Sequence, residues 1–181
     1  SVPGLAVETC YNPFFGVSDN LVTCWLARQV MTEDFILLNG DTLFLTPVLE
    51  GLLRSPLAPL TLAINHKPRY DDDDMKVSLD ARSGLKAVGK TLDPACVNGE
   101  SIGLMLFRGH GVDAFSQALD AAVRSPSALK AWYLSVINAL TDTLRIDTLA
   151  IGDNWWGEVD SVSDLENVRQ ILEELENEKP D

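Results

Sequence analysis

The sequence has few of the residues on which several common kinds of site depend. It contains two histidines, His66 and His110, and both are expected in surface or turn positions, where neither provides the base of an acyl-transfer site. Its three cysteines are widely spaced, odd in number and form no C-x-x-C pair, which speaks against a zinc site and a disulfide framework. We therefore expect a reducing, cytoplasmic setting.

Positive charge is also scarce. The chain carries 14 Lys and Arg against 27 Asp and Glu, a formal net charge of −13 at pH 7. Because proteins bind nucleic-acid backbones through clustered Lys and Arg, we expect no nucleic-acid partner. An anionic small substrate would need a local cation, and the candidates are Lys76, Lys90 and a bound metal ion.

Long apolar runs are missing as well. No run approaches the length of a membrane span, and the first residues, SVPGLAVE, lack the basic, apolar and small-residue regions of a secretory signal. We expect no membrane partner. With 181 residues, 46% hydrophobic content, no internal repeat and no dividing linker, the chain is expected to form a single domain over residues 1–181.

The apolar periodicity predicts strands that alternate with helices. This alternation is typical of an α/β fold, a Rossmann-like three-layer sandwich whose mixed sheet is mostly parallel and carries an added β-hairpin. Because no β-α unit precedes the first predicted strand, we expect an N-terminally incomplete sheet with one exposed edge. Strands are expected at residues 5–10, 35–38, 60–65, 100–107, 145–151 and 156–160, a hairpin at 75–80 and 85–92, and helices at 19–31, 46–53, 112–123, 127–140 and 162–176.

One stretch organises the rest. Four large apolar residues at 35–38 predict a strand buried on both faces, and Asn39-Gly40-Asp41 then ends it abruptly. Asp41 would lie at the carboxyl end of a central strand, where open α/β sheets bind ligands; alternatively, it caps a turn. Far downstream, a second strand-like run ends at Asp160. Two such carboxylates can share one Mg²⁺, whose other positions are left to water and substrate phosphates.

Four segments together carry a resemblance to a known family. In this order and spacing, FILLNGDTLF (35–44), MKVSLDARSGLKAVGKTL (75–92), GESIGLMLF (99–107) and WWGEVDSVSDLENV (155–168) resemble the nucleotidyltransferases that activate sugar phosphates, phosphocholine or inositol phosphate. The cytidylyltransferase branch is the most similar, since its members show an Asn-Pro-Phe/Tyr loop and an Asn at a helix start. Here these are the Asn-Pro-Phe of residues 12–14 and Asn20. The resemblance covers nearly the whole chain.

The resemblance implies a GT-A-like sheet and a specific reaction. An acceptor phosphate attacks the α-phosphorus of a nucleoside triphosphate, CTP in this branch, and pyrophosphate is released. The partners implied are therefore the triphosphate and a small phosphorylated acceptor. Asp41 and Asp160 match the two metal-binding aspartates of the family, which implies Mg²⁺ as the cofactor. Catalysis of this kind depends mainly on positioning and electrostatics.

Further positions match the family less closely, and each has a plainer reading. Lys76 and Lys90 match basic positions that can face phosphates, or they are solvated hairpin lysines. Glu100 matches a Glu that can hold a substrate hydroxyl or ammonium group, or it is a carboxylate at a strand edge. Asn20 can contact the substrate or cap its helix.

The final motif offers two more candidates. Trp156, with Trp155, can line a site that binds a quaternary ammonium group by cation–π attraction. Alternatively, it belongs to the core. Glu158 lies two residues before Asp160 and would point to the same face of a regular strand, which makes it a secondary ligand candidate.

The chain also departs from the family pattern. Members open with a strand that runs into a glycine-rich loop with a basic residue and a nearby lysine, and we find no such segment here. The one Gly-x-Gly, at Gly109 and Gly111, joins a predicted strand to a predicted helix, and we do not interpret it as a dinucleotide fingerprint. After the aromatic pair Trp132-Tyr133, Leu134 stands where relatives commonly place a Glu, which makes choline a poorer acceptor.

Two hypotheses of different class follow. In the first, the chain is the larger C-terminal part of a nucleotidyltransferase and has little activity unless another segment supplies the glycine-rich loop. In the second, it is a non-catalytic remnant that binds a small ligand. Under either hypothesis, a homodimer can form through the exposed sheet edge. A glycosyltransferase is a third reading, although Asn39-Gly40-Asp41 offers one acid where such enzymes show Asp-x-Asp.

Overall fold

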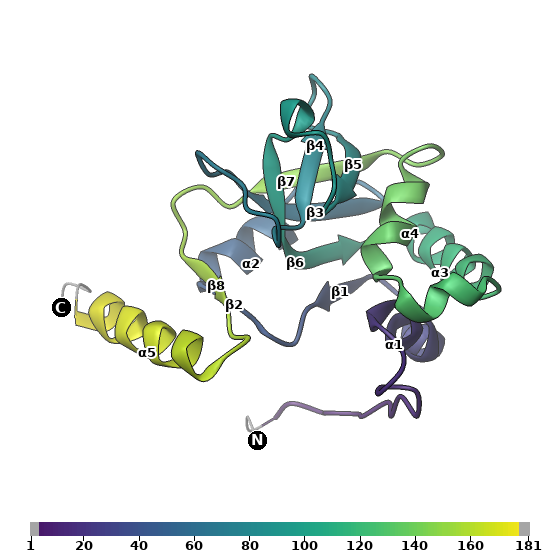
Figure 1. Cartoon of the computed structure of the whole chain (residues 1–181), viewed down its shortest axis with the longest axis horizontal. Helices are drawn as coiled ribbons and strands as arrows, with labels where there is room; N and C mark the ends of the chain where they lie inside the picture. Colours follow the sequence, from purple (N-terminus) through teal and green to yellow (C-terminus); the bar gives the residue numbers. More distant parts are fainter. Residues whose placement is uncertain (1–3, 178–181) are drawn as a thin grey trace.

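The centre of the fold is a six-stranded mixed sheet (Figure 1). The computed structural model describes residues 4–177, so both ends of the domain expected over residues 1–181 lie outside it. Its strand order is β5-β4-β6-β3-β7, and β1 also pairs with β6. A second, two-stranded sheet joins β2 (Thr42–Phe44) to β8 (Trp156–Glu158). The six strands are β1 (Phe35–Leu38), β3 (Leu60–Asn65), β4 (Lys76–Leu79), β5 (Leu85–Gly89), β6 (Gly99–Phe107) and β7 (Ile146–Ala150).

Strand β6 determines how the sheet is paired. All nine of its residues are buried, and it runs antiparallel to β1, β3 and β4. These three strands and β7 therefore run in one direction, yet only β3 and β7 form a parallel pair. The α/β class, the mixed sheet and the hairpin of β4 with β5 are confirmed. The pairing itself is mostly antiparallel, because an antiparallel strand occupies the middle of the sheet.

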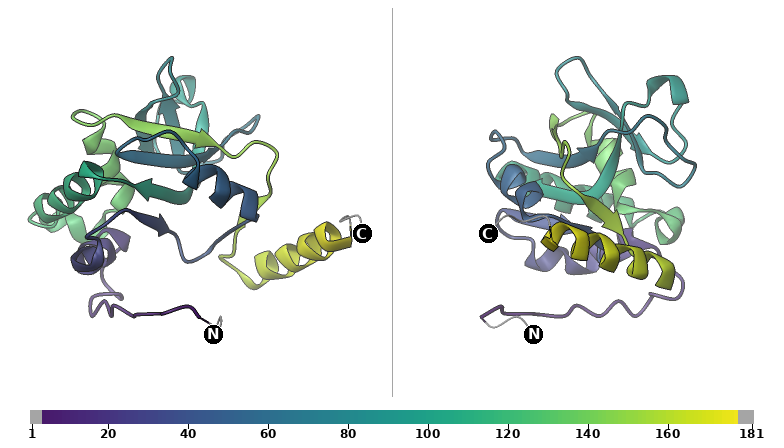
Figure 2. Two further views of the ribbon diagram at one scale, coloured as in Figure 1. Left: turned by 180° about the vertical axis from the view of Figure 1, so that it is seen from behind. Right: turned by 90° about the vertical axis from the view of Figure 1, so that its left-hand side faces the viewer.

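Helices cover both faces of the sheet, as a three-layer sandwich requires. Figures 1 and 2 show α1, α3 and α4 grouped together and α2 apart from them, and the two hydrophobic clusters place these groups on opposite faces. Helix α5 extends away from the sheet beyond β8. The bounds are α1 (Asn20–Ala27), α2 (Thr46–Leu53), α3 (His110–Ala122), α4 (Tyr133–Leu140) and α5 (Val162–Asn177), with short 3₁₀ helices at Arg28–Val30, Pro94–Cys96 and Pro126–Lys130. None of these helices in residues 4–177 combines the length and the apolar character needed to cross a membrane.

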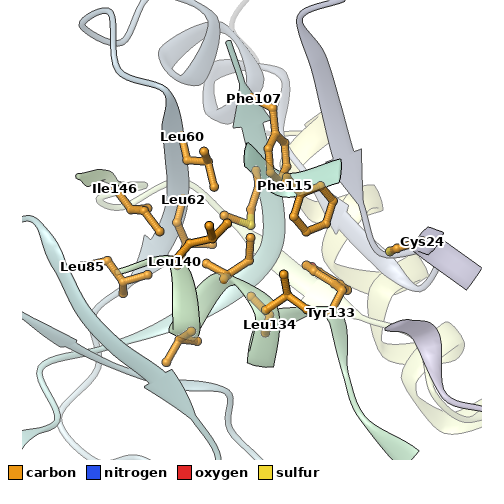
Figure 3. Packing of buried hydrophobic residues seen from close by; sticks show 14 of the residues in the cluster. Cys24, Leu60, Leu62, Leu85, Phe107, Phe115, Tyr133, Leu134, Leu140 and Ile146 are labelled. Carbon is orange, nitrogen blue, oxygen red and sulfur yellow. The ribbon is translucent and has the colours of Figure 1, made fainter. Parts of the chain in front are cut away.

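The larger core lies between the sheet and the group α1, α3 and α4 (Figure 3). Phe107 of β6 stacks on Phe35 of β1 with ring centroids 4.5 Å apart, and its centroid lies 4.6 Å from that of Phe115 in α3. Phe107 and Phe115 are fully buried. Such aromatic pairs add about 0.5–1.5 kcal/mol each beyond the burial of apolar area, so this cluster anchors β1 and α3 to the same strand.

Strand β1 is an edge strand, which corrects the expectation that it is buried on both faces. Within residues 4–177 it pairs only with β6. Phe35 and Leu37 pack into the core, whereas Ile36 and Leu38 on the other face are 37% and 45% exposed. The apolar run alone could not reveal this, because the side chains of an edge strand and of a central strand can be equally apolar.

Two other expected elements differ from the structure. Residues 5–10 form no strand, and Leu5 and Val7 are 64% and 72% exposed, because no described strand lies beside them to pair with. The helix expected over 127–140 is divided into a 3₁₀ helix and α4. The carbonyl oxygens of Leu129 and Ala131 accept hydrogen bonds from the N–H groups of Asp19 and Leu21 at the start of α1, so they do not continue a helix.

Candidate active site

A cavity of about 410 Å³ lies where β1 and β4 separate along β6. Both strands pair with the same edge of β6, β4 with residues 99–100 and β1 with residues 104–107, so residues 101–103 are paired with neither strand. Gly103, with φ of +72°, lies in this gap, at an irregularity of the register with β3. The turn after β1 and the loop before β4 supply the adjoining walls. The lining includes the acids Asp41, Asp73, Asp74, Glu100, Glu158 and Asp160, the aromatics Trp132, Tyr133 and Trp156, and one basic residue, Lys90.

Asp41 and Asp160 line this same cavity. The small sheet of β2 and β8 brings them together, because Thr42, the residue after Asp41, pairs with Glu158, two residues before Asp160. The N–H of Val159 also donates a hydrogen bond of 2.9 Å to the carbonyl oxygen of Asp41. Burial first, and then the negative charges of Asp41 and Asp160, raise the pKa of Glu158 above its usual value. Asp41 and Asp160 therefore lie close enough to Glu158 for their charges to act on it.

The donor chemistry of this group suits a hard cation. Carboxylate oxygens are the ligands that Mg²⁺ prefers, and one or two of them suffice when water and substrate phosphates complete the shell. Within residues 4–177, no three side chains of His, Cys, Asp or Glu are arranged to hold a metal ion by themselves. Asp41 and Asp160, with Glu158 beside them, thus fit a metal that is shared with a substrate rather than a closed metal cage.

A second group of charges surrounds Glu100 and Asp74 of the cavity lining and includes Lys67, which was not predicted from the sequence as a site residue. The ammonium of Lys67 lies 2.7 Å from Asp74 and 2.8 Å from Glu100, and Asn65 donates a hydrogen bond of 2.8 Å to Glu100. Burial alone would lower the pKa of Lys67, but hydrogen bonds to these two carboxylates raise it above its usual value. Lys67 lies two residues after Asn65, the last residue of β3, so the rule that directed attention to Asp41, a polar residue just past the carboxyl end of a strand, also applies to it.

The two lysines proposed for phosphate binding lie in different surroundings. Lys90 lines the cavity, with its ammonium 3.5 Å from Asp73 and 5.0 Å from the ring centroid of Trp132. Lys76 is buried, and its ammonium donates to the carbonyl oxygens of Lys90, Asp72 and Asp74 at 3.0, 3.4 and 3.5 Å. The structure therefore brings Lys90 to the cavity, whereas Lys76 is not part of the lining and joins the acidic loop to the residue that follows β5.

The remaining predicted residues also meet at this cavity. Asn20, Glu100 and Trp156 line it, and the side-chain oxygen of Asn20 accepts a hydrogen bond of 2.9 Å from the N–H of Tyr133. Trp132 was not predicted as a site residue, and it reaches the cavity because the backbone between the two short helices is extended. Leu134 contributes an apolar surface to the lining.

One pattern in the sequence points to different chemistry, and the structure argues against it. Residues 99–103 read Gly-Glu-Ser-Ile-Gly and so match G-x-S-x-G, the signature of a nucleophile elbow, which requires a sharp strand-to-helix turn. Here the pattern lies within strand β6. Ser101 is 5% exposed and accepts a hydrogen bond from the N–H of Gly103, and no histidine lines the cavity among the described residues.

Solved nucleotidyltransferase structures share this fold. The inositol-1-phosphate CTP transferase from T. maritima aligns with a TM-score of 0.71 and 18% identity over 94% of this chain and 67% of its own. The CTP:phosphocholine cytidylyltransferase from Streptococcus pneumoniae aligns with a TM-score of 0.66 and 14% identity over 89% of this chain and 67% of its own. A structure described as a putative glucose-1-phosphate thymidylyltransferase from Bacillus anthracis aligns with a TM-score of 0.63 and 13% identity over 86% of this chain and 61% of its own.

The chain therefore has the nucleotidyltransferase fold, and it spans about two thirds of the length of the solved proteins that it resembles. At these identities the likeness concerns the fold alone. No protein-family profile matches the sequence, and no curated protein matches it either.

Proposed function

We propose that this chain is the acceptor-binding and metal-binding part of a nucleotidyltransferase that moves a CMP group from CTP to a small phosphorylated acceptor. In the reaction, an acceptor phosphate oxygen bonds to the α-phosphorus, the bond from this phosphorus to the bridging oxygen breaks, and pyrophosphate leaves. The observation that carries the proposal is the convergence of Asp41, Glu158 and Asp160 on one cavity of this fold.

The charge of the cavity explains why a metal ion belongs to the proposal. Six acidic side chains line it against one lysine, so two phosphate-bearing substrates would be repelled from both the wall and each other. Mg²⁺ held by Asp41 and Asp160 would neutralise part of that charge when bound, and Glu158 lies beside these two ligands. Lys90 supplies the second positive charge, and we assign it to the phosphate of the acceptor or of CTP.

The part of the lining around Glu100 and Asp74, here called the acceptor wall, supports a polar acceptor. Glu100 and Asp74 are held by Lys67 and both line the cavity, and a carboxylate there can accept a hydrogen bond from a hydroxyl or ammonium group of the acceptor. Asn20 and Trp156 also line the cavity, and we assign them to the acceptor as well. Since Lys90 already lies over the ring of Trp132, and Leu134 adds no charge, a hydroxyl-rich acceptor suits the wall better than a quaternary ammonium group.

The triphosphate side of the cavity is less complete. Among the described residues, Gly103 is the only glycine in the lining, so no glycine-rich loop cradles a triphosphate there. We therefore expect weak CTP binding by residues 1–181 alone and stronger activity when a polypeptide that carries such a loop is added. The resemblance to the cytidylyltransferases supports CTP as the donor.

Isothermal titration calorimetry with CTP, with and without Mg²⁺, tests the proposal. We expect binding heat that requires Mg²⁺, that is lost in Asp41→Ala and that is retained in the matched control Asp153→Ala, an exposed acid on the loop before β8. Equal binding by wild type and Asp41→Ala would contradict the proposed site.

A non-catalytic, dimerising protein is the second candidate function. The open edge of β1, with Ile36 and Leu38 partly exposed, favours it, because an uncovered edge strand readily pairs with another strand. If no nucleoside triphosphate binds while thermal unfolding stays cooperative, this candidate replaces the transferase.

A further inference from the structure

The turn that carries Asp41 is fixed by its backbone at three points. The N–H of Asn39 donates to the carbonyl oxygen of Gly103 at 2.9 Å, and the N–H of Thr42 donates to the carbonyl oxygen of Asn39 at 3.4 Å. Across the small sheet, the N–H of Val159 donates to the carbonyl oxygen of Asp41. These bonds fix where the turn begins and ends, and the side chain of Asn39 is held by further contacts.

The side chain of Asn39 packs against Gly103. A Cβ atom on Gly103 would lie 2.5 Å from the amide nitrogen of Asn39 and 2.7 Å from its Cγ, so only glycine leaves room for the carboxamide at this point of β6. The φ of +72° at Gly103 is also one that favours glycine. The carboxamide of Asn39 therefore occupies the space that a side chain at position 103 would take, in the gap between β1 and β4.

Tyr133 holds the same carboxamide from the helical layer. Its hydroxyl donates to the side-chain oxygen of Asn39 at 3.2 Å, and the residue is 2% exposed. Burial first, and then nearby negative groups including Asp41 and Glu158, raise the pKa of Tyr133, so its hydroxyl keeps its proton and remains a donor. The N–H of Tyr133 in turn donates to the side chain of Asn20. One line of hydrogen bonds thus runs from Asn20 in α1, through the first residue of α4, to the turn of Asp41.

We propose that Tyr133 and Asn39 are positioning residues, whose hydrogen bond orients the turn so that Asp41 faces Asp160 across the cavity. The inference rests on the proposed function, because it assigns a role toward the metal-bound triphosphate. Neither residue needs to touch the reacting atoms. Because the same line of bonds includes Asn20 on the acceptor side, it couples the acceptor wall to the metal ligands.

The test uses the full chain and Mn²⁺ as the probe, with free Mn²⁺ measured by electron paramagnetic resonance in the presence of CTP. Tyr133→Phe removes only the hydroxyl, and we expect it to weaken Mn²⁺ binding by about two- to tenfold, the range that one hydrogen bond supplies. Tyr11→Phe, at a position that is 74% exposed, is the matched control and should bind as wild type. Thermal unfolding of each variant is followed to separate binding from folding.

A double-mutant cycle separates positioning from packing. Asn39→Ala removes the acceptor of the bond while leaving Tyr133 in place, and in that background Tyr133→Phe should have no further effect on Mn²⁺ binding. If the two substitutions act additively, or if Tyr133→Phe binds Mn²⁺ as wild type does, the inference is wrong. If wild type and Asp41→Ala bind Mn²⁺ equally, the proposed function itself fails.

Discussion

Val159 and Asp41 are joined by a backbone hydrogen bond of 2.9 Å, although they are 118 positions apart in the sequence. This bond extends the pairing of β2 with β8 by one residue toward the cavity. Because both strands carry their acids at the end that faces the cavity, a pairing of only three residues is enough to bring two distant carboxylates together. The candidate site thus depends on the smaller of the two sheets.

The first prediction concerns the sharing of one ion. Asp160→Asn should weaken Mg²⁺-dependent CTP binding as strongly as Asp41→Asn, by about tenfold or more. Because both acids would hold the same ion, the double variant should bind no more weakly than either single variant. Calorimetry at fixed Mg²⁺ measures all three. If the losses of binding free energy in the two single variants add in full in the double variant, the two acids do not hold the same ion.

The second prediction concerns Lys67, which neutralises two carboxylates in the cavity wall. Lys67→Met leaves the buried Glu100 without its cation and should lower the free energy of unfolding by about 1–3 kcal/mol at pH 7. Lys86→Met, at an exposed position of β5, is the control and should change it by less than about 0.5 kcal/mol. Urea unfolding at pH 7 measures both.

The pH dependence of this pair has a definite sign. Burial acts to raise the pKa of Asp74, but the hydrogen bond from Lys67 and that from the N–H of Asp71 hold it below the usual value of 3.8. Because the pKa of Asp74 is lower in the folded state, its ionised carboxylate stabilises the fold at pH values above 3.8. This contribution is lost as the pH falls through the lowered pKa. The difference between wild type and Lys67→Met should therefore shrink below about pH 4. A difference that stays constant from pH 7 to pH 3 contradicts the assignment.

The sequence predicted most of the elements, because each has strong local signals. Leu60–Asn65, expected as a buried strand, is β3, with five of its six residues buried. Helix α2 begins at Thr46 with Pro47 in its first turn, where a helix was expected. The hairpin of β4 and β5 was predicted from a turn at Ser83-Gly84, and Ser83 is the one non-glycine residue of the described chain with positive φ. Periodicity and turn chemistry are properties of a few neighbouring residues, so a single sequence carries them.

Other features depend on contacts that no local pattern encodes. The exposure of Ile36 depends on what lies beside β1, and the break before α4 depends on N–H groups of α1 that take the carbonyls of Leu129 and Ala131. The role of Lys76 also follows from tertiary contacts, since its ammonium is held by three carbonyl oxygens. In the site, Asp41 and Asp160 could be selected because each ends a strand-like run, and Lys67 follows such a run as well, whereas Trp132 becomes a site residue only through the fold.

The third prediction tests the aromatic contacts that anchor β1 to α3. Phe115 is fully buried against Phe107, so Phe115→Ala should lower the free energy of unfolding by about 3–5 kcal/mol. Leu57→Ala removes a large apolar side chain that is 92% exposed and should change it by less than about 0.5 kcal/mol. Thermal and urea unfolding measure both variants. Equal effects would mean that the packing in Figure 3 does not carry the stability of this layer.

The last prediction concerns the open edge of β1. If two copies of the chain pair there, Ile36→Lys should shift the population to monomer, because a lysine on an edge strand opposes strand addition and Ile36 is only 37% exposed in the single chain. Val30→Lys is the control, since Val30 is 72% exposed and lies outside the strand. Sedimentation velocity over a hundredfold range of concentration measures both. Because Ile36 lies outside the cavity lining, dimerisation and CTP binding should change independently, and an Ile36→Lys monomer that still binds CTP would separate the two candidate functions.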